Sequence, residues 1–195
     1  MAASDTWLVV GLGNPGREYA NTRHNVGQMV LDELASRASA PFKSHKTDTH
    51  VAEGRVRPGG PKLILAKSNG YMNTSGGPVS RLLKFYSLEP AQLIVVQDEL
   101  DIPFDTLKLK SGGGHGGHNG VRDIIKATGT GDFTRVRVGV GRPSGSRDAA
   151  DHVLAAFSAA ERKTLPILIS DAADAVELIT EQGLTAAQLK FHTAS

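Results

Sequence analysis

The sequence predicts a single α/β domain over residues 1–195, with a mostly parallel or mixed, twisted central sheet flanked by helices. Short apolar runs bounded by turn residues alternate along the chain with segments of helical periodicity, as strands interleaved with helices do. A chain of 195 residues also suits one domain of ordinary size, which buries enough surface to hold a core without disulfides.

The chain begins with a buried strand at 8–10, an apolar run that a glycine closes. Valine and leucine then recur at helical spacing over 26–37 and predict a helix. Two further strands are expected at 47–57 and 62–66, because both segments are bounded by the turn Pro58-Gly59-Gly60-Pro61.

The middle of the chain predicts a second helix, two strands and a third helix. Aliphatic residues at helical spacing mark a helix over 79–86, and the apolar run at 93–96 is typical of a buried strand. A strand with polar edges follows at 106–110. The glycine-rich loop 112–120 then leads into a helix at 120–128, which a glycine ends.

The last part of the chain predicts one strand and then helices. Strict alternation predicts a strand at 135–138 with Arg135 and Arg137 on the same face. Ser158, followed three residues later by a glutamate, forms a capping box that begins a long helix. We expect this helix to reach Gly183, with a break near Pro166, and a short helix to follow it.

Composition excludes several classes of protein. The chain has no cysteine, which rules out disulfides, thiolate nucleophiles and zinc sites built from cysteine. Residues 1–7 do not form a signal peptide, and no apolar stretch approaches the ~20 residues that span a bilayer. We therefore expect a cytoplasmic protein with no membrane partner.

Charge is unevenly distributed along the chain. Residues 1–105 are neutral, residues 106–147 carry a net charge of +6, and residues 148–195 carry −4. A basic middle segment beside an acidic tail suggests that a polyanionic partner docks on one face. The alternative is that these charges are scattered over a solvated surface.

The segment Gly11-Leu12-Gly13-Asn14-Pro15-Gly16 matches the glycine pattern of dinucleotide-binding folds and follows a predicted strand. Such folds need a helix that begins inside the glycine run, so that its amides hold the pyrophosphate. Residues 17–25 lack the apolar stripe of such a helix. We therefore do not favour a nicotinamide or flavin enzyme, although dinucleotide binding stays an alternative.

Four polar side chains lie near the ends of predicted elements: Asn14, Asn73, Asp98 and Asn119. Each one alone could serve as a turn residue or a helix cap. In open α/β sheets, however, the carboxyl ends of the strands form the ligand crevice, so these residues could share one cleft.

His24 is the best candidate for a reactive group in this cleft. The chain has no G-x-S-x-G nucleophile motif, and His24 lies in the irregular segment after the first strand, near Asn14. A histidine whose second ring nitrogen is held by a carboxylate keeps the tautomer that takes a proton from water. We therefore expect His24 to activate water and Asp98 to orient it.

Four other histidines offer further assignments. His115 and His118, with the carboxylates of 98–101, could bind a metal ion, but the glycine-rich backbone around them is too pliant to preset ligands without help. We therefore expect no metal. His152 and His192 lie in or near predicted helices and are expected at the surface.

Five blocks stand out in chain order: Val10-Gly11-Leu12-Gly13-Asn14-Pro15-Gly16, Thr22-Arg23-His24-Asn25-Val26-Gly27, Tyr71-Met72-Asn73-Thr74-Ser75-Gly76, Asp98-Glu99-Leu100-Asp101 and Gly113-Gly114-His115-Gly116-Gly117-His118-Asn119-Gly120. Together they resemble the motif set of the bacterial peptidyl-tRNA hydrolase family, and the resemblance spans nearly the whole chain. It implies hydrolysis of the ester that joins a peptide to the 3′-terminal ribose of tRNA, by a monomeric enzyme that uses neither metal nor cofactor.

The resemblance also implies roles for individual residues. His24 matches the catalytic base, Asp98 its orienting carboxylate, and Asn14 an asparagine that positions water or substrate and stabilises the oxyanion. Lys110 and Arg137 match a basic pair proposed to hold the tRNA 5′-phosphate. The positions that match substrate-binding residues are Asn73, Asn119, Tyr19, Tyr71 and Met72.

Some positions depart from the family pattern. Gln97 stands where histidine is frequent, and Ser68 and Gly70 stand where proline and threonine are usual. Phe104-Asp105 departs from a turn that normally ends in glycine, and Leu189 replaces an asparagine. None of these changes removes a catalytic candidate. The main rival hypothesis is an RNA-binding module that holds tRNA without cleaving it.

Overall fold

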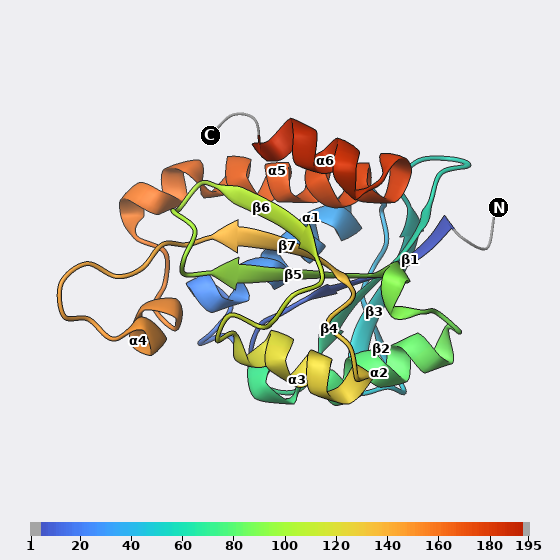
Figure 1. Cartoon of the computed structure of the whole chain (residues 1–195), viewed down its shortest axis with the longest axis horizontal. Coiled ribbons are helices and arrows are strands. Elements are labelled where there is room, and N and C mark those ends of the chain that lie inside the picture. The colour runs from blue at the N-terminus through green and yellow to red at the C-terminus, as the bar shows by residue number, and fades with distance from the viewer. Residues whose placement is uncertain (1–4, 193–195) are drawn as a thin grey trace.

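The computed structural model describes residues 5–192 and contains a seven-stranded sheet with the order β2-β3-β4-β1-β5-β7-β6 (Figure 1). The strands are β1 (Thr6–Gly11), β2 (Lys43–His45), β3 (Thr49–Arg55), β4 (Lys62–Ser68), β5 (Leu93–Glu99), β6 (Leu107–Ser111) and β7 (Thr134–Gly139).

Four neighbouring strands in the middle of the sheet, β4, β1, β5 and β7, run parallel to one another. At one edge, β3 pairs antiparallel with β4 and β2 with β3, and at the other edge β6 pairs antiparallel with β7. The sheet is therefore mixed, which confirms the predicted fold class. Because the inner strands are parallel, their carboxyl ends meet at one edge of the molecule.

Helices cover both faces of the sheet (Figure 1). The α-helices are α1 (Val26–Arg37), α2 (Gly76–Phe85), α3 (Asn119–Thr128), α4 (Ala149–Val153), α5 (Ala159–Gln182) and α6 (Leu184–His192), and the short 3₁₀ turns are η2 (Arg23–Asn25), η3 (Met72–Thr74) and η4 (Pro90–Gln92). Helices α1, α5 and α6 pack on one face, and α2 and α3 pack on the other.

This double covering explains why the central strands read as continuous apolar runs rather than as alternating patterns. In β1, Val9 packs in the core under α1 and α5, whereas Leu8 and Val10 pack in the core under α2 and α3. All three side chains are buried.

The first glycine of the apparent dinucleotide motif, together with Gly27, serves helix packing instead. A Cβ atom on Gly11 would lie 2.4 Å from the carbonyl oxygen of Gly27, and one on Gly27 would lie 2.2 Å from that of Val96. Only glycines let α1 approach β1 and β5 this closely. Residues 12–22 form no helix, and the first helical turn is η2. The phosphate-binding helix that a dinucleotide site needs is therefore missing from this part of the described chain.

The structure corrects several predicted elements. Strand β2 and helix α4 were not predicted, because three and five residues are too few to show a period. Asp98 lies within β5 rather than after it. The predicted break at Pro166 is wrong: α5 continues through it, since the helix buries Leu168, Ala172 and Val176 just beyond.

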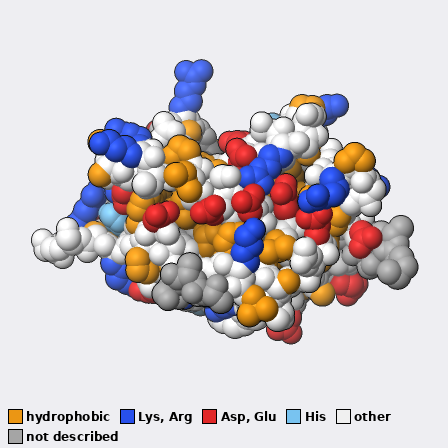
Figure 2. Space-filling view, turned by 90° about the horizontal axis from the view of Figure 1, so that it is seen from above, with side chains coloured by type: hydrophobic (Ala, Val, Ile, Leu, Met, Phe, Trp, Pro, Cys, Tyr) orange, Lys and Arg blue, Asp and Glu red, His pale blue; other side chains and the backbone are white. Residues whose placement is uncertain are grey.

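Several acidic residues of the C-terminal segment form ion pairs with basic residues from the first part of the chain. Acidic residues of α5 lie on the outer face, among lysine and arginine side chains (Figure 2). Asp174 and Glu177 pair with Arg37, and Glu181 pairs with Arg57. Across residues 5–192, none of the helices has the length and apolar character needed to cross a membrane.

Candidate active site

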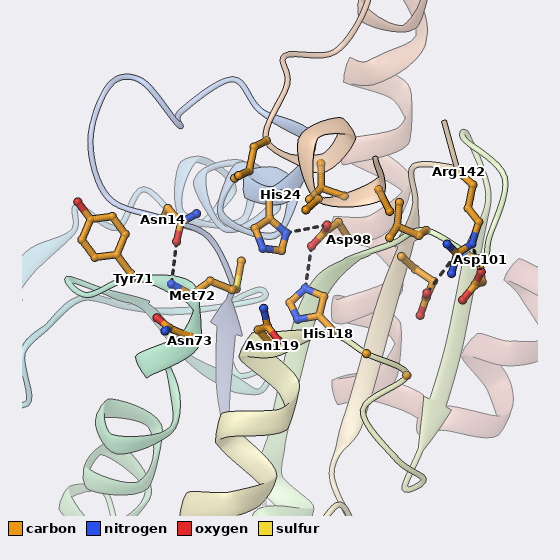
Figure 3. A pocket seen from close by; sticks show the side chains of 18 residues that line it. Asn14, His24, Tyr71, Met72, Asn73, Asp98, Asp101, His118, Asn119 and Arg142 are labelled. Atoms are coloured by element: carbon orange, nitrogen blue, oxygen red, sulfur yellow. Dashed lines mark hydrogen bonds and ion pairs between the residues drawn. The ribbon is translucent and has the colours of Figure 1, made fainter. Parts of the chain in front are cut away.

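A cleft of about 530 Å³ opens at the carboxyl ends of the parallel strands (Figure 3). The loops after β1, β4 and β7 and the end of β5 form its walls, together with the loop before α3 and helix α4. Its lining includes most of the predicted site residues: Asn14, His24, Tyr71, Met72, Asn73, Asp98 and Asn119. Tyr19 does not line it directly, but its ring lies edge-on to that of Tyr71, with the ring centres 6.3 Å apart.

His24 and Asp98 are in direct contact at the base of the cleft. Nδ1 of His24 lies 2.8 Å from Oδ2 of Asp98, whose side chain is 3% exposed. Because the carboxylate accepts this hydrogen bond, the proton sits on Nδ1 and Nε2 keeps its lone pair. Burial alone lowers the pKa of His24, but the charge and hydrogen bond of Asp98 outweigh it, so the pKa is raised.

Buried residues on both sides of His24 hold the η2 turn in place. Arg23 donates to the backbone oxygen of His152 at 3.0 Å and pairs with Glu161 at 2.8 Å. The side chain of Asn25 accepts from the amide of Asn14 and donates to its carbonyl, both at 2.9 Å. These contacts join the η2 turn both to the loop after β1 and to the segment around α4 and α5.

His118, which the sequence suggested only as a candidate metal ligand, also contacts Asp98 at the base of the cleft. Its Nε2 lies 2.8 Å from Oδ1 of Asp98, so one carboxylate binds two imidazoles (Figure 3). The amides of Gly120 and Val121 donate to its Nδ1, at 3.2 and 3.4 Å, and the side chain thereby caps α3. Since Nδ1 accepts these hydrogen bonds, Nε2 carries the ring proton and donates a hydrogen bond to Asp98.

A histidine is an uncommon cap, which is why the glycine-rich sequence alone did not point to this role. Burial alone raises the pKa of Asp98, but His24 and His118 outweigh it and hold the pKa well below its usual range. The carboxylate is therefore ionised at neutral pH. It can orient His24 and stabilise the imidazolium that forms when His24 takes a proton.

Among residues 5–192, His24, Asp98 and His118 could together bind a metal ion, because their ligand atoms lie within 4.8 Å of one another. The nitrogens that face Asp98 and both of its oxygens are already used in two hydrogen bonds. A metal ion would have to replace both bonds. His115, which the metal hypothesis included, instead accepts a hydrogen bond from the amide of Gly117 at 2.9 Å.

Asn14 presents one end of its amide to the cleft. Its Oδ1 accepts from the backbone amide of Met72 at 2.7 Å, and the side chain is largely buried (Figure 3). That bond fixes which end of the amide is the oxygen, so Nδ2 remains as a donor without a partner among the described residues. Asn73 in η3 and Asn119 at the start of α3 are exposed residues of the cleft lining.

Lys110 and Arg137 line a second cavity of about 220 Å³. This cavity shares Glu99, Asp101 and Gly116 with the cleft around His24 and Asp98, so the two adjoin. Burial is the largest cause that lowers the pKa of Lys110, followed by the nearby charges of Arg137 and Arg135. Positive charge is therefore concentrated beside the cleft.

Arg135 does not join this pair as an exposed cation, although both arginines project from the same face of β7. It is 1% exposed, and its guanidinium donates to the backbone oxygens of Gly113, Gly114 and Gly131. The surface prediction for His152 is also wrong: this residue is buried, because its segment packs on the η2 turn.

Two of the departures from the family pattern have local explanations. Asp105 has φ +67°, a conformation in which aspartate can replace glycine. The hydroxyl of Ser68 accepts from the amide of Gly70 at 3.0 Å and closes that turn. Gln97 is buried beside Asp98 and lines the basic cavity, whereas Leu189 is 64% exposed.

A histidine oriented by a buried carboxylate, in a cleft at the carboxyl ends of a mixed sheet, is typical of a hydrolase that works by general-base catalysis. A family model described as peptidyl-tRNA hydrolase matches residues 8–195. The chain belongs to the peptidyl-tRNA hydrolase family, as its motifs led us to expect.

Individual relatives agree with this assignment over nearly their whole length. A peptidyl-tRNA hydrolase of Leifsonia xyli subsp. xyli is 76% identical over 188 residues, which cover 96% of this chain and 97% of the relative. One from Arthrobacter sp. is 63% identical over 191 residues and covers 98% of each chain. The crystal structure of peptidyl-tRNA hydrolase from Acinetobacter baumannii superposes with a TM-score of 0.89 at 35% identity, covering 97% of this chain and 96% of that one.

Proposed function

We propose that this chain hydrolyses the ester between a peptide and the 3′-terminal ribose of tRNA, with water activated by His24 and with Asp98 orienting His24. The observation that carries the proposal is the 2.8 Å contact between Nδ1 of His24 and Asp98. It leaves the lone pair of Nε2 available in a cleft large enough for a peptide end and a ribose.

The reaction begins when Nε2 of His24 takes a proton from a water molecule as the water oxygen attacks the ester carbonyl carbon. The resulting imidazolium is stabilised by the ionised Asp98. The tetrahedral intermediate then collapses, and the bond from carbon to the ribose oxygen breaks. That oxygen takes the proton back from His24, which yields a free carboxylic acid and a tRNA with its ribose hydroxyl restored.

Asn14 is the proposed oxyanion donor. Because Met72 holds its Oδ1, Nδ2 is pre-aimed and needs little reorganisation when negative charge develops on the carbonyl oxygen. Asn73 and Asn119, the exposed amides of the cleft lining, bind the peptide main chain and the attacking water, and Tyr71 and Met72 form the adjoining wall with Tyr19 behind it.

Lys110 and Arg137 are the proposed ligands of the tRNA 5′-phosphate. They line a cavity that adjoins the cleft, and a phosphate there would be neutralised by two cations whose own mutual repulsion it relieves. We also propose that the enzyme works as a cytoplasmic monomer without cofactor.

The direct test incubates the protein with peptidyl-tRNA and separates free tRNA from ester-linked tRNA. We expect release of free tRNA by the wild type and almost none by His24→Ala, with the variant still binding tRNA. Binding without release by the wild type would favour the RNA-binding module instead.

A further inference from the structure

We propose that Arg135 is a positioning residue for ester hydrolysis: it fixes the glycine-rich loop 112–117 so that His118, at the end of that loop, holds Asp98 in place. This inference rests on the proposed function of His24 and Asp98. The sequence placed Arg135 on the same strand face as Arg137 and suggested no positioning role for it.

Hydrogen bonds within the loop are confined to its second half, where the amides of Gly117 and His118 donate to Nδ1 and the carbonyl of His115, at 2.9 and 3.0 Å. Gly112, Gly113, Gly116 and Gly117 all have positive φ values, between 59° and 90°, and glycine loses the most conformational freedom when it is ordered. Added Cβ atoms on Gly114, Gly116 and Gly117 would meet nothing within 4 Å, so no neighbouring group packs against that side of these residues. The loop therefore needs an anchor from elsewhere.

Arg135 is placed to be that anchor. Nη1 donates to the oxygen of Gly114, and Nη2 donates to those of Gly113 and Gly131, at 2.8 and 2.9 Å. Its guanidinium carbon lies 4.6 Å from the centre of the Phe133 ring, which backs the group from a second direction. One planar fork thus joins the loop before α3 to the turn after it.

The packing at this junction is tight. A Cβ atom on Gly131 would lie 2.6 Å from the oxygen of Gly113 and 3.2 Å from Nη2 of Arg135. The two backbone segments can meet around the guanidinium only because residue 131 has no side chain. This offers a way to disturb the anchor without removing its charge.

The anchored loop leads directly to the catalytic pair. It ends at His118, whose Nε2 donates to Oδ1 of Asp98 while His24 occupies Oδ2. Gly116, Gly117 and His118 also line the catalytic cleft. A loop displaced by about 1 Å would loosen the carboxylate that aims His24, and misplacement of that size can cost ~10²-fold in rate.

Arg135 also lines the cavity that contains Lys110 and Arg137, but the same contacts make it a poor phosphate ligand. Both terminal nitrogens are committed to backbone carbonyls, and the side chain is 1% exposed. Lys110 and Arg137, on the same side of the sheet, are half-buried, and neither donates such hydrogen bonds to backbone carbonyls within residues 5–192. Arg135 should therefore affect turnover, and Arg137 should affect tRNA binding.

The test compares four variants of the full chain in peptidyl-tRNA hydrolysis: Arg135→Lys, Gly131→Ala, Arg137→Met and Arg55→Met. Measurements are kcat, KM, the dependence of KM on salt, and hydrogen exchange of the amides in 112–120. Arg55 is the matched control, since it donates to the carbonyl of Gly60 at 2.9 Å in an exposed turn far along the sheet.

We expect Arg135→Lys to lower kcat about tenfold or more, although it keeps the charge, because one ammonium cannot reproduce the fork to three carbonyls. Its amides in 112–120 should exchange faster, and its salt dependence should match the wild type. Gly131→Ala should show the same two effects. Arg137→Met should instead raise KM and reduce the slope of log KM against log salt concentration by about one. Arg55→Met should resemble the wild type.

Wild-type kcat in Arg135→Lys would overturn the inference, as would a change confined to KM and its salt dependence, since either would make Arg135 a source of charge only. If Arg135→Lys does not fold, Gly131→Ala decides: faster loop exchange with unchanged kcat would also overturn it. Activity in His24→Ala at the wild-type rate would mean that the proposed function itself fails, whereas loss in His24→Ala with normal Arg135→Lys rejects the anchor alone.

Discussion

Asn14 offers the sharpest test of the proposed chemistry, because its two amide atoms have separate tasks. Oδ1 accepts from the buried amide of Met72 at 2.7 Å, and Nδ2 is the donor left for the oxyanion. Asn14→Asp keeps an oxygen for Met72 but replaces the donor with a second acceptor. Asn14→Ala removes both.

The expected magnitudes follow from these contacts. Loss of one oxyanion donor costs about 3 kcal/mol of transition-state stabilisation, which is roughly a 10²-fold fall in kcat for both variants. Asn14→Ala also leaves the buried amide of Met72 without its acceptor, which costs about 1–3 kcal/mol of folding stability. Asn14→Asp keeps that bond and should unfold at a temperature closer to the wild type.

The assay measures single-turnover release of tRNA from peptidyl-tRNA, with thermal unfolding of each variant alongside. Asn21→Asp is the matched control, because it makes the same change at an exposed position of the same loop. If Asn14→Asp hydrolysed the ester within about threefold of the wild-type rate while Asn21→Asp did likewise, Asn14 would not be the oxyanion donor.

The remaining predictions concern the base, its partner, the phosphate site and metals. His24→Ala should nearly abolish hydrolysis with tRNA affinity largely intact, as equilibrium binding would check. The rate should fall as pH drops through the raised pKa of His24, since only neutral imidazole accepts a proton. Asp98→Asn should lower kcat and move that acidic limb to lower pH, because burial then acts on His24 without the opposing carboxylate; an unmoved limb contradicts the pair. Lys110→Ala or Arg137→Ala should raise KM and make its salt dependence shallower, and an effect on kcat alone counts against phosphate binding. A chelator should leave the rate of hydrolysis unchanged. Loss of activity on chelator treatment would instead support the metal hypothesis.

Much of the fold follows from local patterns in the sequence. The buried runs of β1 and β5 and the helical spacing of α1 predicted those elements, because each extends over enough residues to show its period. The predicted capping box at Ser158 is also confirmed, since α5 begins at the next residue. Strand β2 and helix α4 were not predicted from the sequence, because contacts with neighbouring segments hold them and they are too short to show a period. The extent of the domain over residues 1–195 and the monomeric state stay predictions.

By itself, the sequence determined the fold class and the candidates His24, Asp98 and Asn14, since strand ends and motif residues are local features of the chain. Only the tertiary structure decided that His118 shares Asp98 with His24 and that Arg135 is buried rather than exposed. Both outcomes depend on contacts between residues some twenty positions apart, made across the sheet and a glycine loop. Alternation along a strand tells which face a side chain takes, but not whether that face meets solvent or the carbonyls of another segment.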